Sequence, residues 1–263
     1  MAWTTLLGLL LGFGAVLVSN MIEGGTPASL INAPGAVIVF GGTFGIAFLA
    51  FPPHITLGLP KTIMQIFRHK LESPTKVIEL LVELADKARR QGLLALEEEE
   101  GRIKDPFLKK AIQLVVDGTD PEVVRHLLTT ETARMTERHH AGTAILEAMG
   151  GYAPTMGIIG TVMGLVNVLS KLGEDPSHLG ESIATAFLAT FYGVSSANLL
   201  WLPLGSKLRR ADEEEVLLRQ IMTEGVLAIQ AGDNPRIVRS KLEAFLAPKA
   251  RARIAASSGG TGE

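Results

Sequence analysis

The sequence predicts an all-α, polytopic membrane protein with four transmembrane helices and a helical cytoplasmic domain. Four apolar stretches contain no Asp, Glu, Lys or Arg, and each is near the length of about 20 residues that a helix needs to cross a bilayer core. They are residues 3–22, 33–51, 149–170 and 183–205. The sequence outside them is heavily charged, its apolar residues have helical spacing, and no β-strand pattern is convincing.

The composition and the motifs limit the chemistry of the chain. It has 263 residues, a formal net charge of −2 and no cysteine. The lack of a basic excess argues against a nucleic-acid partner, and the lack of cysteine excludes disulfides and thiolate metal sites. There is no phosphate-binding Gly-Lys-Ser/Thr loop and no nucleophile elbow, and the six histidines lack metal-site spacing. We therefore expect neither an enzyme nor a cofactor or metal site in this chain alone.

The first two spans are expected to form a hairpin through residues 23–32, a turn rich in Gly, Pro, Ser and Asn. The cytoplasmic segment that follows shows repeated helix-start signals, in which a capping residue precedes proline. We expect its helices at residues 60–71, from Ser73-Pro74 to Gly92, at 93–100, from Asp105-Pro106, and from Asp120-Pro121 onward.

The last of these helices has no break residue before the third span except Gly142, which predicts one long helix that enters the membrane. The fourth span likewise continues to about residue 231, where Gly232 ends it. Asn234-Pro235 begins a final amphipathic helix to about Leu246. The predicted parts are residues 1–52 and 149–205 for the two pairs of spans, 53–148 for the cytoplasmic domain, and 206–263 for C-terminal helices and a disordered tail.

The flanking charges predict the orientation in the membrane. Lys and Arg follow the second and fourth spans, whereas the short loops inside the two span pairs are mainly acidic. Short loops rich in Lys and Arg stay on the cytoplasmic side. We therefore expect both termini in the cytoplasm.

The third and fourth spans contain many small and hydroxyl residues, which a helix that faces only lipid does not need. Glycines and alanines recur at three- and four-residue steps, and each span carries a threonine near its middle. Such faces allow close helix packing, and they also leave space for a foreign helix between the two spans. The residues are Gly157, Gly160, Gly164 and Thr161 in the third span, and Ala186, Gly193 and Thr190 in the fourth, with Pro154 and Pro203 beside them.

No span offers an ionisable residue, although ion paths through membranes usually need one. Either the protein moves no ions, or a partner helix supplies the carboxylate. Threonine hydroxyls and backbone carbonyls are then available as further oxygen ligands for a hard cation.

The cytoplasmic segment contains a patch of both charge signs, with two arginines before a run of four glutamates. A charge run of this kind is usually a solvated face, and it is also suited to an interaction surface. The residues concerned are Arg89, Arg90, Glu97, Glu98 and Glu100.

These features together resemble the A subunit of the bacterial flagellar stator, the MotA/PomA type, which is related to TolQ and ExbB proteins. The resemblance covers nearly the whole chain and is most specific at residues 88–97, 153–165 and 189–193, with Asn198 and Pro203. It implies a homo-oligomeric ring, generally of five A subunits around two B subunits. The B subunit supplies the ion-binding Asp and a peptidoglycan-binding domain.

The resemblance also implies roles for single residues. Arg89, Arg90, Glu97, Glu98 and Glu100 correspond to charged residues that engage the rotor protein FliG. Pro154 and Pro203 correspond to prolines that couple ion passage to conformational change. Thr161 and Thr190 correspond to hydroxyls that line the ion route.

The presence of both hydroxyls favours Na⁺ over H⁺, since Thr is typical of sodium-driven members at the position of Thr161, whereas many proton-driven members have Ala there. Related proton-driven proteins also carry Gly-Thr at this point. Two other functions stay open: a TolQ/ExbB-type energiser of outer-membrane processes, which usually has one N-terminal span, and a membrane scaffold without ion flux.

Overall fold

The computed structural model describes residues 2–68, 72–170, 179–248 and 250–251. Over these residues the protein is helical and contains no β-strand, as the sequence predicted. Contacts divide the chain into two compact units. Unit 1 comprises Met1–His69 with Arg138–Ala211, and unit 2 comprises Lys70–Glu137 with Asp212–Glu263.

Unit 1 contains the four predicted spans, which the described helices match in length and composition. The first span is α1 (Ala2–Ile22), and the second passes from α2 (Ala33–Ala36) through the π-helical turn η2 (Val37–Gly41) into α3 (Gly42–Ala50). The third span is the second part of α7 (Pro121–Ser170). The fourth runs from α8 (Leu179–Ser196) through the π-helical turn η5 (Ala197–Trp201) into α9 (Leu202–Gln230).

The prediction that α7 and α9 continue beyond their spans is confirmed, because α7 is unbroken from Pro121 to Ser170. Gly142 does not interrupt it. A methyl group placed on Gly142 would lie 2.9 Å from Cγ2 of Thr62, so this glycine lets α4 (Pro53–Arg68) approach α7 closely.

The helix α4 begins at Pro53. The predicted start at Pro60, seven residues later, was wrong. Pro53 occupies its first position, where a missing N–H has no consequence, and Pro60 lies inside the helix. The backbone N–H groups of Ile55 and Thr56 both bond to the Pro52 carbonyl and close the first turn. The predicted end at Leu71 lies outside the described residues.

The apolar core of unit 1 joins α3, α4, α7, η5 and α9. Trp201 from η5 is buried in it, and the ring of Phe44 meets the Trp201 ring edge-on with 5.9 Å between centroids. The other buried members are Ala47, Leu59, Ile66, Ile145, Leu146, Met149, Ala153, Ala197, Leu204 and Leu208.

Unit 2 packs short helices against the charged parts of α7 and α9. These helices are α5 (Pro74–Gln91), the 3₁₀ segment η3 (Leu93–Arg102), α6 (Pro106–Val116) and α10 (Pro235–Glu243). Their core includes Leu81, Phe107, Ile112 and Ile221, and the guanidinium of Arg219 lies 4.3 Å above the Phe107 ring.

The helix ends of unit 2 follow local sequence signals. The Asp105 carboxylate accepts the N–H groups of Phe107 and Leu108 at 2.8 and 3.1 Å, and Asn234 caps α10 in the same way. The predicted side-chain cap at Ser73 is wrong: its hydroxyl makes no capping bond, and its carbonyl instead accepts the N–H of Val77. Gly92 ends α5 with a φ of +87°, which a side chain would oppose.

The predicted division of the chain into four parts is based on where the chain enters and leaves the membrane. The two compact units are based on packing contacts and do not test it, so the four-part division stays a prediction. The predicted disorder of residues 247–263 lies mostly outside the described residues.

Candidate functional site

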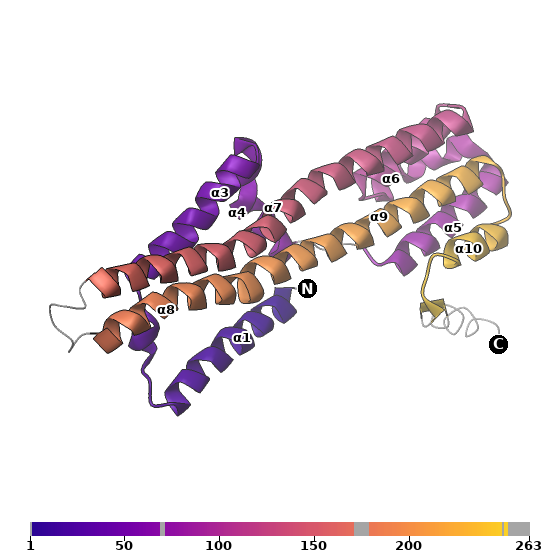
Figure 1. The fold of residues 1–263 in the computed structure, drawn as a ribbon. Helices are drawn as coiled ribbons and strands as arrows, with labels where there is room; N and C mark the ends of the chain where they lie inside the picture. The colour runs from indigo at the N-terminus through magenta and orange to yellow at the C-terminus, as the bar shows by residue number, and fades with distance from the viewer. Residues whose placement is uncertain (1, 69–71, 171–178, 249, 252–263) are drawn as a thin grey trace. The chain divides into compact units, whose positions relative to one another are not determined.

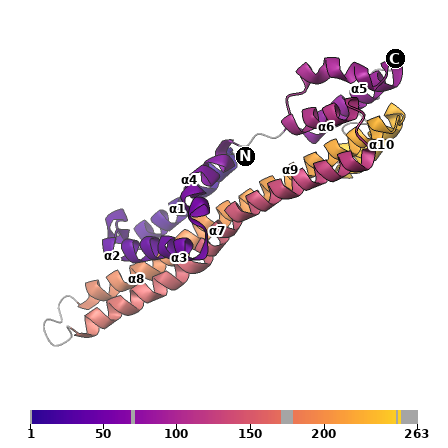
Figure 2. The same ribbon diagram turned by 90° about the horizontal axis from the view of Figure 1, so that it is seen from above.

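Helices α7 and α8 lie side by side in unit 1, in both views (Figures 1 and 2). They approach through the small residues that the sequence singled out. A methyl group on Gly157 would lie 2.8 Å from the carbonyl oxygen of Ala189 and 3.0 Å from Cα of Thr190. One on Gly193 would lie 3.1 Å from the Cα atoms of Gly157 and Pro154. We call this contact of Gly157, Gly160, Gly164, Ala186, Ala189 and Gly193 the glycine seam.

The second span covers one side of the glycine seam. A methyl group on Gly160 would lie 2.8 Å from Cγ2 of Ile38 and 2.7 Å from Cβ of Ala189. Ile38 belongs to the π-helical turn η2. One extra residue per turn changes which side chains the helix presents, and π-turns are frequent at functional sites. The extra residue in η2 thus places an aliphatic side chain directly on the seam.

The two predicted threonines meet across the seam. The hydroxyl oxygens of Thr161 and Thr190 lie 2.6 Å apart, although the residues come from different helices. Thr161 also bonds to the carbonyl oxygens of Ala186 at 2.9 Å and Gly157 at 3.1 Å, and Thr190 reaches the Gly157 carbonyl at 3.4 Å. Four oxygen atoms therefore form one cluster, which we call the threonine cluster.

The threonine cluster carries no formal charge. No Asp, Glu, Lys, Arg or His occurs in the four apolar stretches of the sequence, and no group of three acidic or histidine residues suited to a metal lies in the part that the structure describes. A hard monovalent cation accepts hydroxyl and carbonyl oxygens as ligands, but its charge is balanced only by an anionic group. The cluster thus gathers oxygen atoms without a counter-charge.

A tyrosine that the sequence analysis did not single out fixes the entrance to the second span. The Tyr192 hydroxyl on α8 accepts the backbone N–H of Asn32 at 2.6 Å and donates to the carbonyl of Leu30. The Asn32 side chain accepts the N–H of Gly35 at 2.6 Å and so caps α2. The Asn32 cap before Ala33-Pro34 was readable from the sequence, whereas nothing local marks Tyr192.

The two predicted prolines have different surroundings in the helix pair. Pro154 is half-buried in the unbroken helix α7, and its backbone Cα lies 3.1 Å from the Cβ position of Gly193 at the seam. Pro203 is exposed and lies two residues after the end of the π-helical turn η5. Proline has no N–H for the carbonyl four residues earlier, and a π-turn at this place accommodates the missing bond. The carbonyl concerned belongs to Leu199, whose side chain packs at 3.0 Å against the Cβ position of Gly12 in α1.

The predicted charged patch in unit 2 divides into paired and unpaired residues. Arg90 pairs with Asp86 at 3.0 Å, Glu98 with Lys87 at 3.0 Å, and Glu100 with Lys109 at 3.0 Å. Arg89 and Glu97 are exposed and form no ion pair with the described residues. These two side chains are therefore the ones whose charge the fold leaves uncompensated.

Glu99 and Lys87, which the prediction passed over, hold η3 on α5. Lys87 Nζ lies 2.9 Å from Glu99 and 3.0 Å from Glu98, and Arg102 lies 2.7 Å from Glu99. The hydrogen bonds from Lys87 and then Arg102 lower the pKa of Glu99 below its ordinary value. The same bonds, first to Glu99 and then to Glu98, raise the pKa of Lys87.

The fold defines a polytopic helical membrane protein, and the threonine cluster is an uncharged polar site between two of its spans. Comparison with known proteins agrees with this class. Residues 99–246 match the profile of the MotA/TolQ/ExbB proton channel family. The chain belongs to this family, within which it is a flagellar stator A subunit of the MotA/PomA type.

The relatives are similar over nearly the full chain. Motility protein A of Borreliella burgdorferi is 40% identical over 259 residues, which cover 97% of this chain and 98% of the relative. Chemotaxis protein PomA of Vibrio alginolyticus is 40% identical over 242 residues, 92% of this chain and 94% of the relative.

Solved structures give the same result. The flagellar MotAB stator complex from Bacillus subtilis matches with a TM-score of 0.89 and 36% identity, over 95% of this chain and 98% of that one. The structure of C. jejuni MotAB matches with a TM-score of 0.89 and 31% identity, over 94% of this chain and 97% of that one. The family is one of channel and stator subunits and not a known class of enzymes.

Proposed function

We propose that this chain, with a B-type subunit, forms a cation channel that converts inward ion flow into torque on the flagellar rotor. Na⁺ is favoured over H⁺ as the driving ion. The observation that carries the proposal is the threonine cluster, in which Thr161 and Thr190 bring two hydroxyls and two carbonyls together without any acid. A bare proton needs no such set of oxygens, whereas Na⁺ is held by several of them.

The missing charge defines the partner. The B-type subunit supplies an ion-binding Asp from its single membrane helix, and its peptidoglycan-binding domain holds that helix still. Several A subunits, five in the proposed 5:2 complex, surround the two B helices. The outward-facing apolar side chains of α7 are available for these contacts, since Ile158, Val162 and Leu169 are each about half or more exposed in the single chain.

Ion passage turns the ring by changing the cost of burying the partner Asp. The anion is expensive to move past the apolar glycine seam, and a bound cation neutralises it. Each charge that crosses the membrane supplies about 2.3 kcal/mol per 100 mV of potential. The close backbone contact at Gly157 and Gly193 limits how α7 and α8 move against each other, while Pro154 and Pro203 mark the places where they bend.

The charged patch of unit 2 transmits the torque to the rotor. Arg89 and Glu97 contact the rotor protein FliG, and the ion pairs of Arg90, Glu98 and Glu100 shape the surface around them. The proposed orientation, with both termini in the cytoplasm and the inner membrane as location, follows from Lys and Arg after the second and fourth spans.

Swimming speed against external Na⁺ concentration tests the proposed ion and site. Thr161→Ala removes three of the contacts in the threonine cluster, and we expect the half-saturating Na⁺ concentration to rise by about tenfold or the dependence to be lost. Thr155→Ala is the matched control, because the Thr155 hydroxyl is exposed on the same helix and bonds only within its own turn, to Tyr152. A Thr161→Ala curve that coincides with the control would remove the case for Na⁺.

Co-purification tests the wider proposal. We expect a single-span partner with an acid in its membrane helix to co-purify with this chain. Selective cation transport by this chain without any partner would contradict the proposal that the partner supplies the missing charge.

A further inference from the structure

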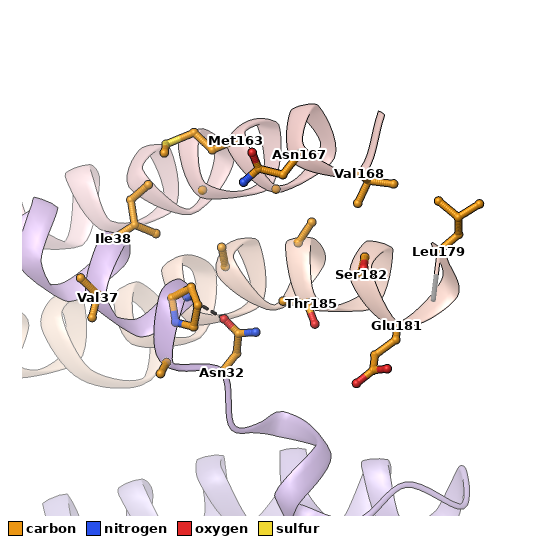
Figure 3. Close-up of a pocket in the computed structure, with 17 residues that line it drawn as sticks. Asn32, Val37, Ile38, Met163, Asn167, Val168, Leu179, Glu181, Ser182 and Thr185 are labelled. Atoms are coloured by element: carbon orange, nitrogen blue, oxygen red, sulfur yellow. Dashed lines mark hydrogen bonds between the residues drawn. The ribbon is translucent and has the colours of Figure 1, made fainter. Parts of the chain in front are cut away.

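The two units offer different kinds of surface to a partner. Unit 1 is hollowed between the second span and helices α7 and α8 by a pocket of about 1100 Å³, which borders the glycine seam (Figure 3). Unit 2 projects a large apolar side chain, since Leu94 in η3 is 72% exposed. The other large apolar side chains that the structure describes as exposed in unit 2 are at most 50% exposed: Val123, Leu127 and Ile237.

The 3₁₀ geometry of η3 divides its side chains into rows. A 3₁₀ helix has three residues per turn, so side chains three positions apart lie above one another. The inner row comprises Leu93, Leu96 and Glu99. Leu96 is fully buried, Leu93 packs against the core of unit 2, and the Glu99 carboxylate lies 2.9 Å from Lys87 Nζ. These contacts fix the rotation of η3 about its own axis.

The row that begins at Leu94 therefore faces outward. It continues with Glu97, which is exposed, and with Glu100, which is half-buried and lies 3.0 Å from Lys109. Leu94 and Glu97 are one turn apart, which is about 6 Å along the axis of a 3₁₀ helix. Arg89 lies in the last turn of α5, shortly before this row begins. An exposed leucine thus lies within the charged patch that the proposed function assigns to the rotor.

Single exposed leucines are common on protein surfaces, but two observations favour a contact at Leu94. Ion pairs join η3 to Lys87 of α5 and to Lys109 of α6, so the side chain is presented from a fixed backbone, which lowers the entropy cost of binding. The position of Leu94 also fits the usual anatomy of a protein interface, in which an apolar centre is surrounded by polar and charged groups.

We propose that Leu94 is the apolar anchor of the rotor contact, seated in an apolar recess of FliG that has a basic side chain at its rim, opposite Glu97. This inference rests on the proposed function, which places FliG on the charged patch. Charge selects the occupant: η3 contains four glutamates and one arginine among its ten residues, which favours a basic protein surface over an anionic membrane surface. Burial of the leucine holds the contact, while the charges orient it.

The salt dependence of FliG binding separates these two contributions, because salt screens exposed charges and leaves apolar burial in place. The complex of this chain with its B-type partner is held in lipid nanodiscs. Its affinity for purified FliG is measured at about 0.1 M and about 1 M salt, where the Debye length is about 10 Å and about 3 Å. Leu94→Ala should weaken binding by about tenfold at both concentrations, because three carbon atoms leave the contact. Arg89→Glu should change the affinity at the lower concentration alone.

Two further variants serve as controls. Leu94→Met keeps an apolar side chain of similar size and should bind within about twofold of the wild type. Ile237→Ala is the matched control, since Ile237 is a half-exposed apolar side chain on α10 of the same unit. Wild-type affinity in Leu94→Ala, or an equal loss in Leu94→Ala and Ile237→Ala, would overturn the inference. A lower unfolding temperature of Leu94→Ala, or fewer A subunits per complex, would also overturn it, since the leucine would then serve the fold or a contact between copies.

Failure of the anchor is distinguishable from failure of the rotor contact itself. If Arg89→Glu weakens binding at low salt while Leu94→Ala binds like the wild type, the anchor is wrong and the charged contact stands. If the wild-type complex does not bind FliG at either salt concentration, both are wrong.

Discussion

Replacing Gly157 by alanine tests whether the glycine seam is a required backbone contact. The added methyl would lie 2.8 Å from the Ala189 carbonyl oxygen, 3.0 Å from the Thr190 Cα and 3.3 Å from the Gly193 Cα. All three neighbours are backbone atoms, so no side-chain rotation relieves the overlap. The helices must separate, and the 2.6 Å contact between Thr161 and Thr190 must lengthen.

The size of the effect follows from two opposing terms. Overpacking of a tight contact costs about 1–3 kcal/mol. Alanine in place of glycine inside a helix stabilises it by about 1 kcal/mol. Gly151→Ala isolates the second term, because Gly151 lies on the same helix and a methyl there has no neighbour within 4 Å. The difference in unfolding free energy between the two variants is therefore expected to be about 1–3 kcal/mol.

Thermal unfolding of the detergent-solubilised complex measures this difference, and swimming speed measures its effect on function. Gly157→Ala should unfold several degrees below Gly151→Ala and lose motility, while Gly151→Ala keeps both. Equal unfolding temperatures together with equal swimming would refute the backbone contact between α7 and α8.

Three further outcomes are expected. Arg89→Glu should reduce swimming more than Arg90→Glu with membrane assembly unchanged, because Arg90 is already held by Asp86 whereas Arg89 has no ion-pair partner among the described residues; equal effects would contradict the distinction. Tyr192→Phe should destabilise the loop before α2 by about 1–3 kcal/mol by leaving buried polar groups unpaired, which limited proteolysis near Asn32 detects, with Tyr152→Phe as the control. The Lys87–Glu99 contact should weaken at both pH extremes. The lowered pKa of Glu99 gives stability that is lost as acid protonates it, and the raised pKa of Lys87 gives stability that is lost as alkali deprotonates it. The protection of η3 against hydrogen exchange, taken relative to the intrinsic exchange rate at each pH, should therefore fall in acid below the ordinary carboxyl value of 4.5 and in alkali above the ordinary ammonium value of 10.5, and stay constant between them.

The spans and most helix boundaries were predictable because their causes are local. A run of apolar residues without charge favours lipid wherever it occurs in a chain. Asp105, Asn234 and Gly92 fix helix ends through their own backbone neighbourhood. The start of α4 was missed because Pro53 and Pro60 are both acceptable first residues, and only packing decides between them.

The candidate site was predicted in composition but not in arrangement. The small residues and the two threonines were recognised from their spacing on each helix. Their partners depend on the register of α7 against α8, which spacing within one helix does not specify. The π-turns η2 and η5 were also missed, since the residues of Val37–Gly41 and Ala197–Trp201 do not distinguish a π-turn from an ordinary α-helical turn.

The sequence by itself determined that this is a four-span helical membrane subunit without its own intramembrane acid, because hydropathy and charge add up along a segment regardless of what surrounds it. Only the tertiary structure decided that Tyr192 holds the loop at Leu30 and Asn32 and that Thr161 meets Thr190. It also decided that Glu100 of η3 pairs with Lys109 of α6. These pairings join residues whose distance is set by how two elements pack, and a hydrogen bond or an ion pair forms only where that packing brings both atoms within about 3 Å.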